Sequence, residues 1–237
     1  EFDKDLFGLI SLCDALRDLK NPIDLDLSAC GLSVNGVNRV AKAISAGAAL
    51  ISINCLANKF GEDDLAALLT AVEGTSIRSL CGLTEGQTTA DFSNQHLGPI
   101  DCKIIAAELG FRGFIAAVAR LTLSGNKITD SQPSSEVYDN DLSGFVSLCG
   151  ALSGLKNPIE LDLSNCGLSV NGLNVLEKAM GAGAALNSVT VDSTGVPFVN
   201  WADKKQRDAT GPRTYTLTAG DETIDLSSKN LGVADVN

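Results

Sequence analysis

Residues 23–32 read Ile-Asp-Leu-Asp-Leu-Ser-Ala-Cys-Gly-Leu, and residues 159–168 read Ile-Glu-Leu-Asp-Leu-Ser-Asn-Cys-Gly-Leu. Apolar and polar residues alternate over the first five positions of each stretch, as they do in a half-buried strand, and a turn then follows. Over residues 34–44, apolar residues recur at helical spacing. The pattern therefore predicts a unit that consists of a strand, a turn and a helix.

A large internal duplication surrounds these two stretches. Residues 3–50, the first copy, align without a gap on residues 139–186, the second copy, and about two thirds of the aligned residues are identical. A weaker correspondence joins residues 89–98 to residues 223–232. We therefore expect two homologous units, residues 1–136 and residues 137–237, the second of which is incomplete, as in a fragment of a longer array.

The same pattern continues through the rest of the chain. Further strands are expected at residues 51–55, 90–92, 120–123, 189–191 and 224–226, with degenerate strands at 77–80 and 214–217. Further helices are expected at residues 6–19, 62–73, 99–109 and 142–155, and a polar loop at 129–140.

These repeats resemble the leucine-rich repeat, L-x-x-L-x-L-x-x-N/C-x-L, in its ribonuclease-inhibitor-like form. The matching residues are Leu25, Leu27, Cys30 and Leu32; Leu50, Ile53, Asn58 and Phe60; Val118, Leu121, Leu123, Asn126 and Ile128; and Leu161, Leu163, Cys166 and Leu168. Residues 77–88, 129–140 and 196–212 depart from the pattern. The resemblance implies an α/β fold: a single leucine-rich repeat solenoid (horseshoe) over residues 1–237, with a parallel sheet on the concave side and helices on the convex side.

The ninth position of this repeat turns the chain inward after the strand. Asn58 and Asn126 occupy it and are expected to hydrogen-bond backbone groups that are left unpaired there, because buried polar backbone needs partners. Cys30 and Cys166 are expected to fill the same position as small, mostly apolar groups. Gly36 and Gly172 are expected to permit close packing at the start of their helices.

The composition is that of a folded, acidic chain. Its 237 residues are 44% hydrophobic, which is enough for a sizeable core, and no apolar stretch approaches the roughly 20 residues of a membrane span. Eighteen basic and 29 acidic residues give a net charge of -11 without a dense basic cluster, which disfavours nucleic acid and favours a basic protein as partner. Seven cysteines without a Cys-x-x-Cys pair favour a reduced, cytoplasmic (intracellular) location.

The sequence shows no catalytic machinery. His96 is the only histidine, so a multi-histidine metal site cannot form within the chain, and no phosphate loop or Gly-x-Ser-x-Gly elbow is present. Cys30 and Cys166 occupy repeat positions without an acid–base partner, which favours a structural role. We therefore predict that the chain is not an enzyme and has no catalytic residue, no cofactor and no metal ion.

The outward-pointing strand positions are the most informative residues, because side chains alternate between the two faces of a sheet. They predict an acidic, hydroxyl-rich concave face. Its predicted protein-binding residues are Asp24, Asp26, Ser28, Asn54, Asp91, Arg120, Thr122, Glu160, Asp162, Ser164, Thr190, Asp192 and Asp225. A merely solvated face accounts for the same pattern about equally well, although carboxylates in register on a rigid sheet would attract a cationic partner.

Three functions remain open at this point. The first is a non-catalytic protein-binding scaffold or recognition module that uses the acidic concave face, as the resemblance to ribonuclease inhibitor implies. The second is a GTPase-activating or other regulatory leucine-rich repeat domain. The third is a structural subunit of a larger assembly or complex, with contacts made by the helical side.

Overall fold

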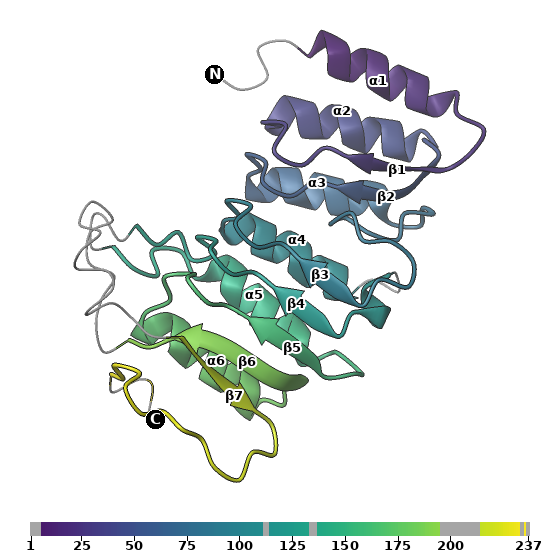
Figure 1. The fold of residues 1–237 in the computed structure, drawn as a ribbon. Coiled ribbons are helices and arrows are strands. Elements are labelled where there is room, and N and C mark those ends of the chain that lie inside the picture. The colour runs from purple at the N-terminus through teal and green to yellow at the C-terminus, as the bar shows by residue number, and fades with distance from the viewer. Residues whose placement is uncertain (1–5, 111–113, 133–136, 195–213, 233–234, 236–237) are drawn as a thin grey trace. The chain divides into compact units, whose positions relative to one another are not determined.

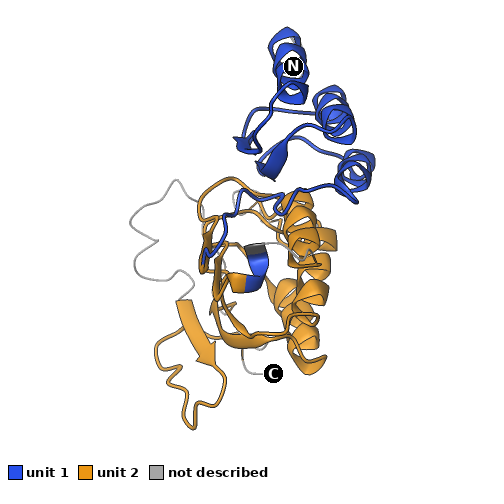
Figure 2. Ribbon diagram, turned by 90° about the vertical axis from the view of Figure 1, so that its right-hand side faces the viewer, with its two compact units in different colours: residues 1–87, 111–116 blue, residues 88–110, 117–237 orange. Residues whose placement is uncertain are grey.

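The computed structural model of this chain describes residues 6–110, 114–132, 137–194, 214–232 and 235. The chain forms two compact units (Figure 2): unit 1 comprises residues 1–87 and 111–116, and unit 2 comprises residues 88–110 and 117–237. In each unit, helices cover one side of a sheet. The boundaries of these units follow spatial contacts and do not test the duplication, so the two homologous units remain a sequence prediction.

Unit 1 alternates helices and strands. Its elements are α1 (Phe7–Arg17), β1 (Ile23–Asp26), α2 (Val34–Ser45), β2 (Leu50–Asn54) and α3 (Glu62–Val72). The two strands are parallel, with Leu25 beside Ile53. Val37, Val40 and Ile44 recur at intervals of three and four residues along α2, which buries them on one side of the helix.

Unit 2 continues the alternation in a larger sheet (Figure 1). Its elements are β3 (Thr89–Asp91), α4 (Pro99–Gly110), β4 (Arg120–Thr122), α5 (Ser143–Leu152), β5 (Ile159–Asp162), α6 (Val170–Gly181), β6 (Leu186–Asp192) and β7 (Thr214–Thr218). The 3-10 helix Phe114–Ala117, which belongs to unit 1 except for Ala117, comes before β4 in the chain. The strand order is β3-β4-β5-β6-β7. The neighbouring strands from β3 to β6 are parallel, while β7 runs antiparallel to β6.

The α/β fold class predicted from the sequence is confirmed, but the expected all-parallel sheet is not. Residues 214–217 form a regular strand that returns along β6, with Thr216 beside Thr190. Residues 224–226 are not a strand, because β7 already occupies the edge of β6 where a following parallel strand would pair. Of residues 77–80, Ser79 forms an isolated bridge with Ser52 of β2.

Two buried asparagines connect consecutive repeats, as predicted. Asn126 is 1% exposed, and its Nδ2 donates to the carbonyls of Phe92 (2.7 Å) and Leu123 (2.8 Å). Its Oδ1 accepts from the amides of Gln95 and Leu97, both at 3.0 Å. In unit 1, Asn58 does the same: its Nδ2 donates to the carbonyls of Leu27 and Cys55, and its Oδ1 accepts from the amide of Leu32. Each asparagine thereby satisfies backbone groups at the ends of two neighbouring strands.

The close packing expected at Gly172 is confirmed. Gly172 lies in the first turn of α6, where its amide donates to Asp139 Oδ2 at 2.7 Å. A Cβ at this position would come within 3.0 Å of Asp139 Oδ1 and of a Leu168 methyl group. The Asp139 carboxylate also accepts from the amide and the hydroxyl of Ser169, so it satisfies amides that would otherwise be unpaired at the helix start.

The described helices include none that combines the length and the apolar character needed to cross a membrane.

Candidate functional site

Two rows of polar side chains cross the sheet of unit 2 in register. We call them together the polar sheet face. One row consists of Thr89, Arg120, Glu160, Ser188 and Thr218, and the other of Asp91, Thr122, Asp162, Thr190 and Thr216. All of these side chains are partly or fully exposed, whereas the residues between the rows on the inner strands, such as Leu121, Leu161 and Val189, are buried. The alternation predicted from the sequence therefore aligns side chains from different repeats on one surface.

Side-chain contacts organise this face and moderate its charge. Arg120 Nε donates to Glu160 Oε2 at 2.8 Å, and the guanidinium and carboxylate form an ion pair across β4 and β5. The hydroxyls of Thr190 and Thr216 are hydrogen-bonded at 2.8 Å. Because the Arg120–Glu160 pair is exposed to solvent, it contributes little to stability. Its effect is to neutralise one carboxylate, so the face is less acidic than the sequence pattern suggests.

An Asp-x-Ser turn recurs where strands end or were expected. The carboxylates of Asp26, Asp91, Asp162 and Asp225 accept a hydrogen bond from the serine amide two residues later, at 2.8 to 2.9 Å. The Ser93 amide bond lowers the pKa of Asp91, and the Ser227 amide bond does the same for the pKa of Asp225. These four aspartates therefore each fix a turn. The sequence contained the signal for this role, since Asp-x-Ser appears in each case.

In unit 1, the candidate residues lie side by side on the two strands. Asp24 lies beside Ser52, and Asp26 lies beside Asn54. The Ser52 hydroxyl donates to Asp24 Oδ1 at 2.8 Å, and Asn54 Oδ1 accepts from the Leu56 amide at 3.2 Å. Asp24 and Asp26 are exposed, while Ser28 and Asn54 are partly buried. The structure thus brings these four candidates together as one group within unit 1.

Two residues of the candidate set do not lie where the sequence placed them. Asp192 is 5% exposed, not on the surface, because the Asn165 amide (2.6 Å) and the Thr214 hydroxyl (2.8 Å) both donate to its carboxylate. Burial raises the pKa of Asp192 above its ordinary value. Asp225 is exposed, but it lies in the irregular segment after β7 and not on a strand. The antiparallel β7 explains both errors, since it covers the end of β6 and excludes a following parallel strand.

Ser164 lies at the end of β5, where its hydroxyl donates to Asp162 Oδ1 at 2.7 Å. Both residues are partly exposed. The unit 2 candidates that share the polar sheet face or adjoin it are Asp91, Arg120, Thr122, Glu160, Asp162, Ser164 and Thr190.

The cysteines divide into one exposed thiol and six buried ones. Burial raises the pKa of Cys149 and of Cys166 to about 12, and it also raises the pKa of Cys102. These three thiols are therefore protonated at neutral pH, a state that suits neither a nucleophile nor a metal ligand. Cys166 fills the repeat position as expected, and its Sγ donates to the Leu123 carbonyl at 3.2 Å. Cys30 holds the matching sequence position, but unlike Cys166 it is exposed.

Iodoacetamide should accordingly label a single cysteine, Cys30, in the folded protein. All seven cysteines lie in the described part of the chain, and the other six are buried. Mass spectrometry of the native protein should show one added group per chain, against seven after unfolding in urea. Labelling of Cys30→Ser should be close to zero before unfolding. Rapid labelling of several thiols in the native wild type would contradict the burial pattern.

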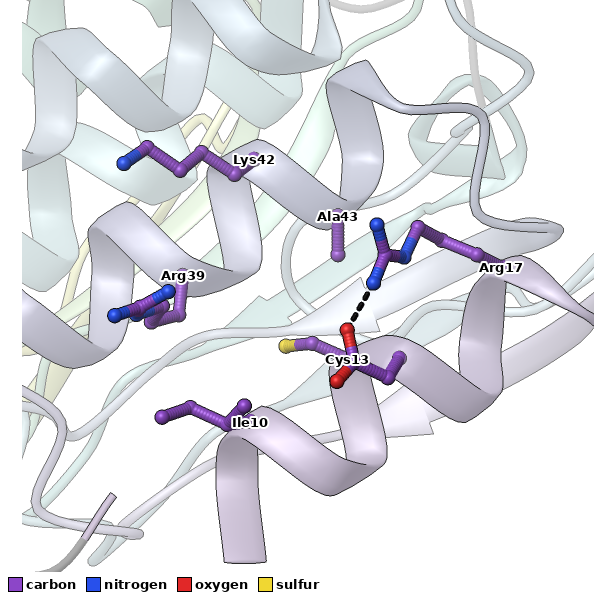
Figure 3. Close-up of a pocket in the computed structure, with 7 residues that line it drawn as sticks. Ile10, Cys13, Arg17, Arg39, Lys42 and Ala43 are labelled. Atoms are coloured by element: carbon purple, nitrogen blue, oxygen red, sulfur yellow. Dashed lines mark hydrogen bonds and ion pairs between the residues drawn. The ribbon is translucent and has the colours of Figure 1, made fainter. Parts of the chain in front are cut away.

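A small pocket lies between α1 and α2 (Figure 3). Its volume is about 150 Å³, and its lining residues are Ile10, Cys13, Asp14, Arg17, Arg39, Lys42 and Ala43. Asp14 forms an ion pair with Arg17, while Arg39 and Lys42 add positive charge from α2. At the matching positions of the second copy, Asp14, Arg17 and Arg39 are replaced by Gly150, Ser153 and Val175. The fold therefore does not require this charged lining.

Sequence reasoning overlooked this pocket. The available signal was a difference between the two copies: Asp14, Arg17 and Arg39 are charged, and the matching residues of the second copy are not. Among the described residues, no group of three or more His, Cys, Asp or Glu side chains is arranged to hold a metal ion.

Comparison with known proteins adds no relative to these observations. No model of a known protein family matches this chain, and no curated protein matches it.

Proposed function

We propose that this chain is a leucine-rich repeat solenoid of the ribonuclease-inhibitor-like type and that it is a non-catalytic protein-binding module. The buried asparagines support the repeat type, because Asn58 and Asn126 each occupy the ninth position and satisfy backbone groups of two consecutive repeats. The binding surface in this proposal is the polar sheet face of unit 2.

The observation that carries the proposal is the alignment of two exposed polar rows across five strands. Strands β3 to β7 all contribute polar side chains to this one surface. The backbone beneath is fixed by the sheet, so a partner that binds there does not have to order it. Hydroxyls and carboxylates on this face accept hydrogen bonds.

The expected partner is a protein segment that presents lysine, arginine or backbone amide donors. Asp91 and Asp162 remain available to such donors on the side away from their serine turns, because a carboxylate has several acceptor positions. The negative charge of the chain as a whole, -11, favours encounter with a cationic partner.

A charge placed in the middle of the face tests this proposal. Thr122→Arg puts a long cation in the row between Asp91 and Asp162. In capture experiments with extract from the source cells, proteins retained by wild type should be retained at least about 10-fold less by this variant, because a buried like charge at an interface costs several kcal/mol.

Asn174→Arg is the matched control, since Asn174 is exposed on α6 and the change in charge is the same. It should retain the captured proteins at the wild-type level, and circular dichroism should show that both variants are folded. Equal retention by Thr122→Arg and Asn174→Arg would refute the sheet face as the binding surface.

A further inference from the structure

The duplication allows one surface of unit 1 to be compared with a homologous surface in unit 2. In the first copy, α1 and β1 lie at one end of unit 1 (Figure 1), and within the described residues β1 pairs with β2 alone. In the second copy, α5 and β5 are the homologous elements, and here both are covered. β4 pairs with β5 on the side away from β6, and the Glu160 amide donates to the Ala119 carbonyl at 2.8 Å.

A glycine at the same position of both copies shows the difference most clearly. Gly144, in the first turn of α5, lies against the start of α4: a Cβ there would overlap the Pro99 carbonyl oxygen and come within 2.5 Å of the carbonyl carbon. Glycine is therefore required at this position for α4 and α5 to approach each other. Gly8 is the matching residue of α1, yet in the described part of the chain no atom lies within 4 Å of the position that its Cβ would take.

Two further pairs of identical residues are also buried in the second copy and exposed in the first. Leu148 on α5 is completely buried, while the matching Leu12 on α1 is 36% exposed. Cys166 is buried, and its Sγ donates to the Leu123 carbonyl of the preceding repeat, while the matching Cys30 is exposed. In the second copy, Gly144 and Cys166 contact residues of a preceding repeat, and Leu148 is buried. In the first copy, the same residues stand on a surface where no such repeat is described.

We propose that α1 and the outer edge of β1 form a docking surface for a strand–turn–helix repeat homologous to residues 88–130. The second copy indicates how the bound repeat would lie. The strand of the bound repeat pairs in parallel with β1 at the amides of Asp24 and Asp26, and the helix of the bound repeat begins against Gly8. By analogy with Arg120 beside Glu160, a basic residue of the occupant lies opposite Asp24.

If nothing packs against the outer side of α1, the presence of glycine at position 8 has no structural reason. Glycine weakens a helix relative to alanine, so a position with open space around it favours alanine. Close approach of another backbone is one condition under which glycine is preferred, and Gly144 shows that condition at the matching position of the second copy.

The test joins residues 88–138 directly to Asp3 of the full chain, so that the junction reproduces the natural junction of Tyr138 and Asp139. Hydrogen–deuterium exchange is then compared between this fusion and the chain itself. We expect the amides of Asp24 and Asp26 to exchange at least about 10-fold more slowly in the fusion, because paired backbone amides exchange only on opening. The thermal midpoint should rise by about 4 °C or more.

Gly8→Ala separates docking from general stabilisation. In the chain itself, this change should leave exchange at Asp24 and Asp26 unaltered and raise the thermal midpoint slightly. In the fusion, it should remove the added protection of both amides. An unaltered exchange rate in the fusion, or the same effect of Gly8→Ala in both proteins, overturns the proposal.

A second copy of the chain is the alternative occupant, and sedimentation over a range of concentrations distinguishes it. The proposal expects no concentration-dependent protection of Asp24 and Asp26 in the chain itself. A dimer that protects these amides overturns the proposal, because the surface would then bind another copy and not a homologous repeat.

Discussion

Replacing Gly144 with alanine should destabilise the protein by at least about 3 kcal/mol, the upper end of the usual cost of overpacking. The added methyl group would overlap the backbone of Pro99, and neither side can yield easily, because Gly144 and Pro99 both lie in the first turn of a helix. Urea unfolding followed by circular dichroism measures the change. The quantity compared is the free energy of unfolding.

Gly8→Ala is the control that the duplication provides. Gly8 occupies the matching position of α1 in the first copy, but space for a methyl group is open around it. This variant should be more stable than wild type by about 0.5–1 kcal/mol, the difference in helix propensity between glycine and alanine. Similar changes in stability for the two variants would show that α4 and α5 do not approach each other as described.

The second large effect is expected for Asn126→Ala, at about 3–5 kcal/mol of lost stability. The change removes hydrogen bonds to two carbonyls and two amides, and because Asn126 is 1% exposed, water cannot replace them without opening the structure. Each buried group that is left unpaired costs about 1–3 kcal/mol, and partial relaxation lowers the total. Thermal and urea unfolding should both report the loss.

Asn140→Ala is the corresponding control on an exposed asparagine. Its side chain donates to Asp130 at the surface, at 2.8 Å, so removal should change stability by no more than about 0.5 kcal/mol. Should Asn126→Ala behave like Asn140→Ala, the proposed connection between consecutive repeats would be without energetic importance, and the leucine-rich repeat assignment would lose its main structural support.

Local sequence patterns predicted an element correctly where the interactions that form it lie within one repeat or between adjacent repeats. The alternation in residues 159–163 places Leu161 in the core and Glu160 and Asp162 on the face, as expected. The role of Asn126 was also predictable, because its position in the repeat specifies which backbone groups need a partner. These features depend on interactions that every repeat makes in the same way.

The features that the sequence did not predict depend on neighbours that the local pattern does not specify. Asp192 follows the alternation of an outward residue, yet β7 covers it by returning along β6. Cys30 and Cys166 have the same local sequence, yet one is exposed and the other is buried. Sequence periodicity says which side a residue faces. It does not say whether something lies on that side.

The charge of the candidate face is moderated for a related reason. The carboxylates along the strands make the face acidic, but Arg120 balances the charge of Glu160, and the aspartates of the Asp-x-Ser turns each accept a serine amide. A hydrogen-bond partner two residues away is visible in the sequence as a motif. A partner on the next strand is visible only once the register is known.

The antiparallel strand β7 also limits how unfolding spreads. In an array of repeats, cooperativity passes between neighbours through their shared interface. β7 lies along the edge of β6, so the residues that follow it, including the half-exposed Ile224, are not joined to β6 by a strand ladder. The five-stranded sheet therefore ends as a cooperative block at β7, and residues 221–230 should fray without weakening the strands before them.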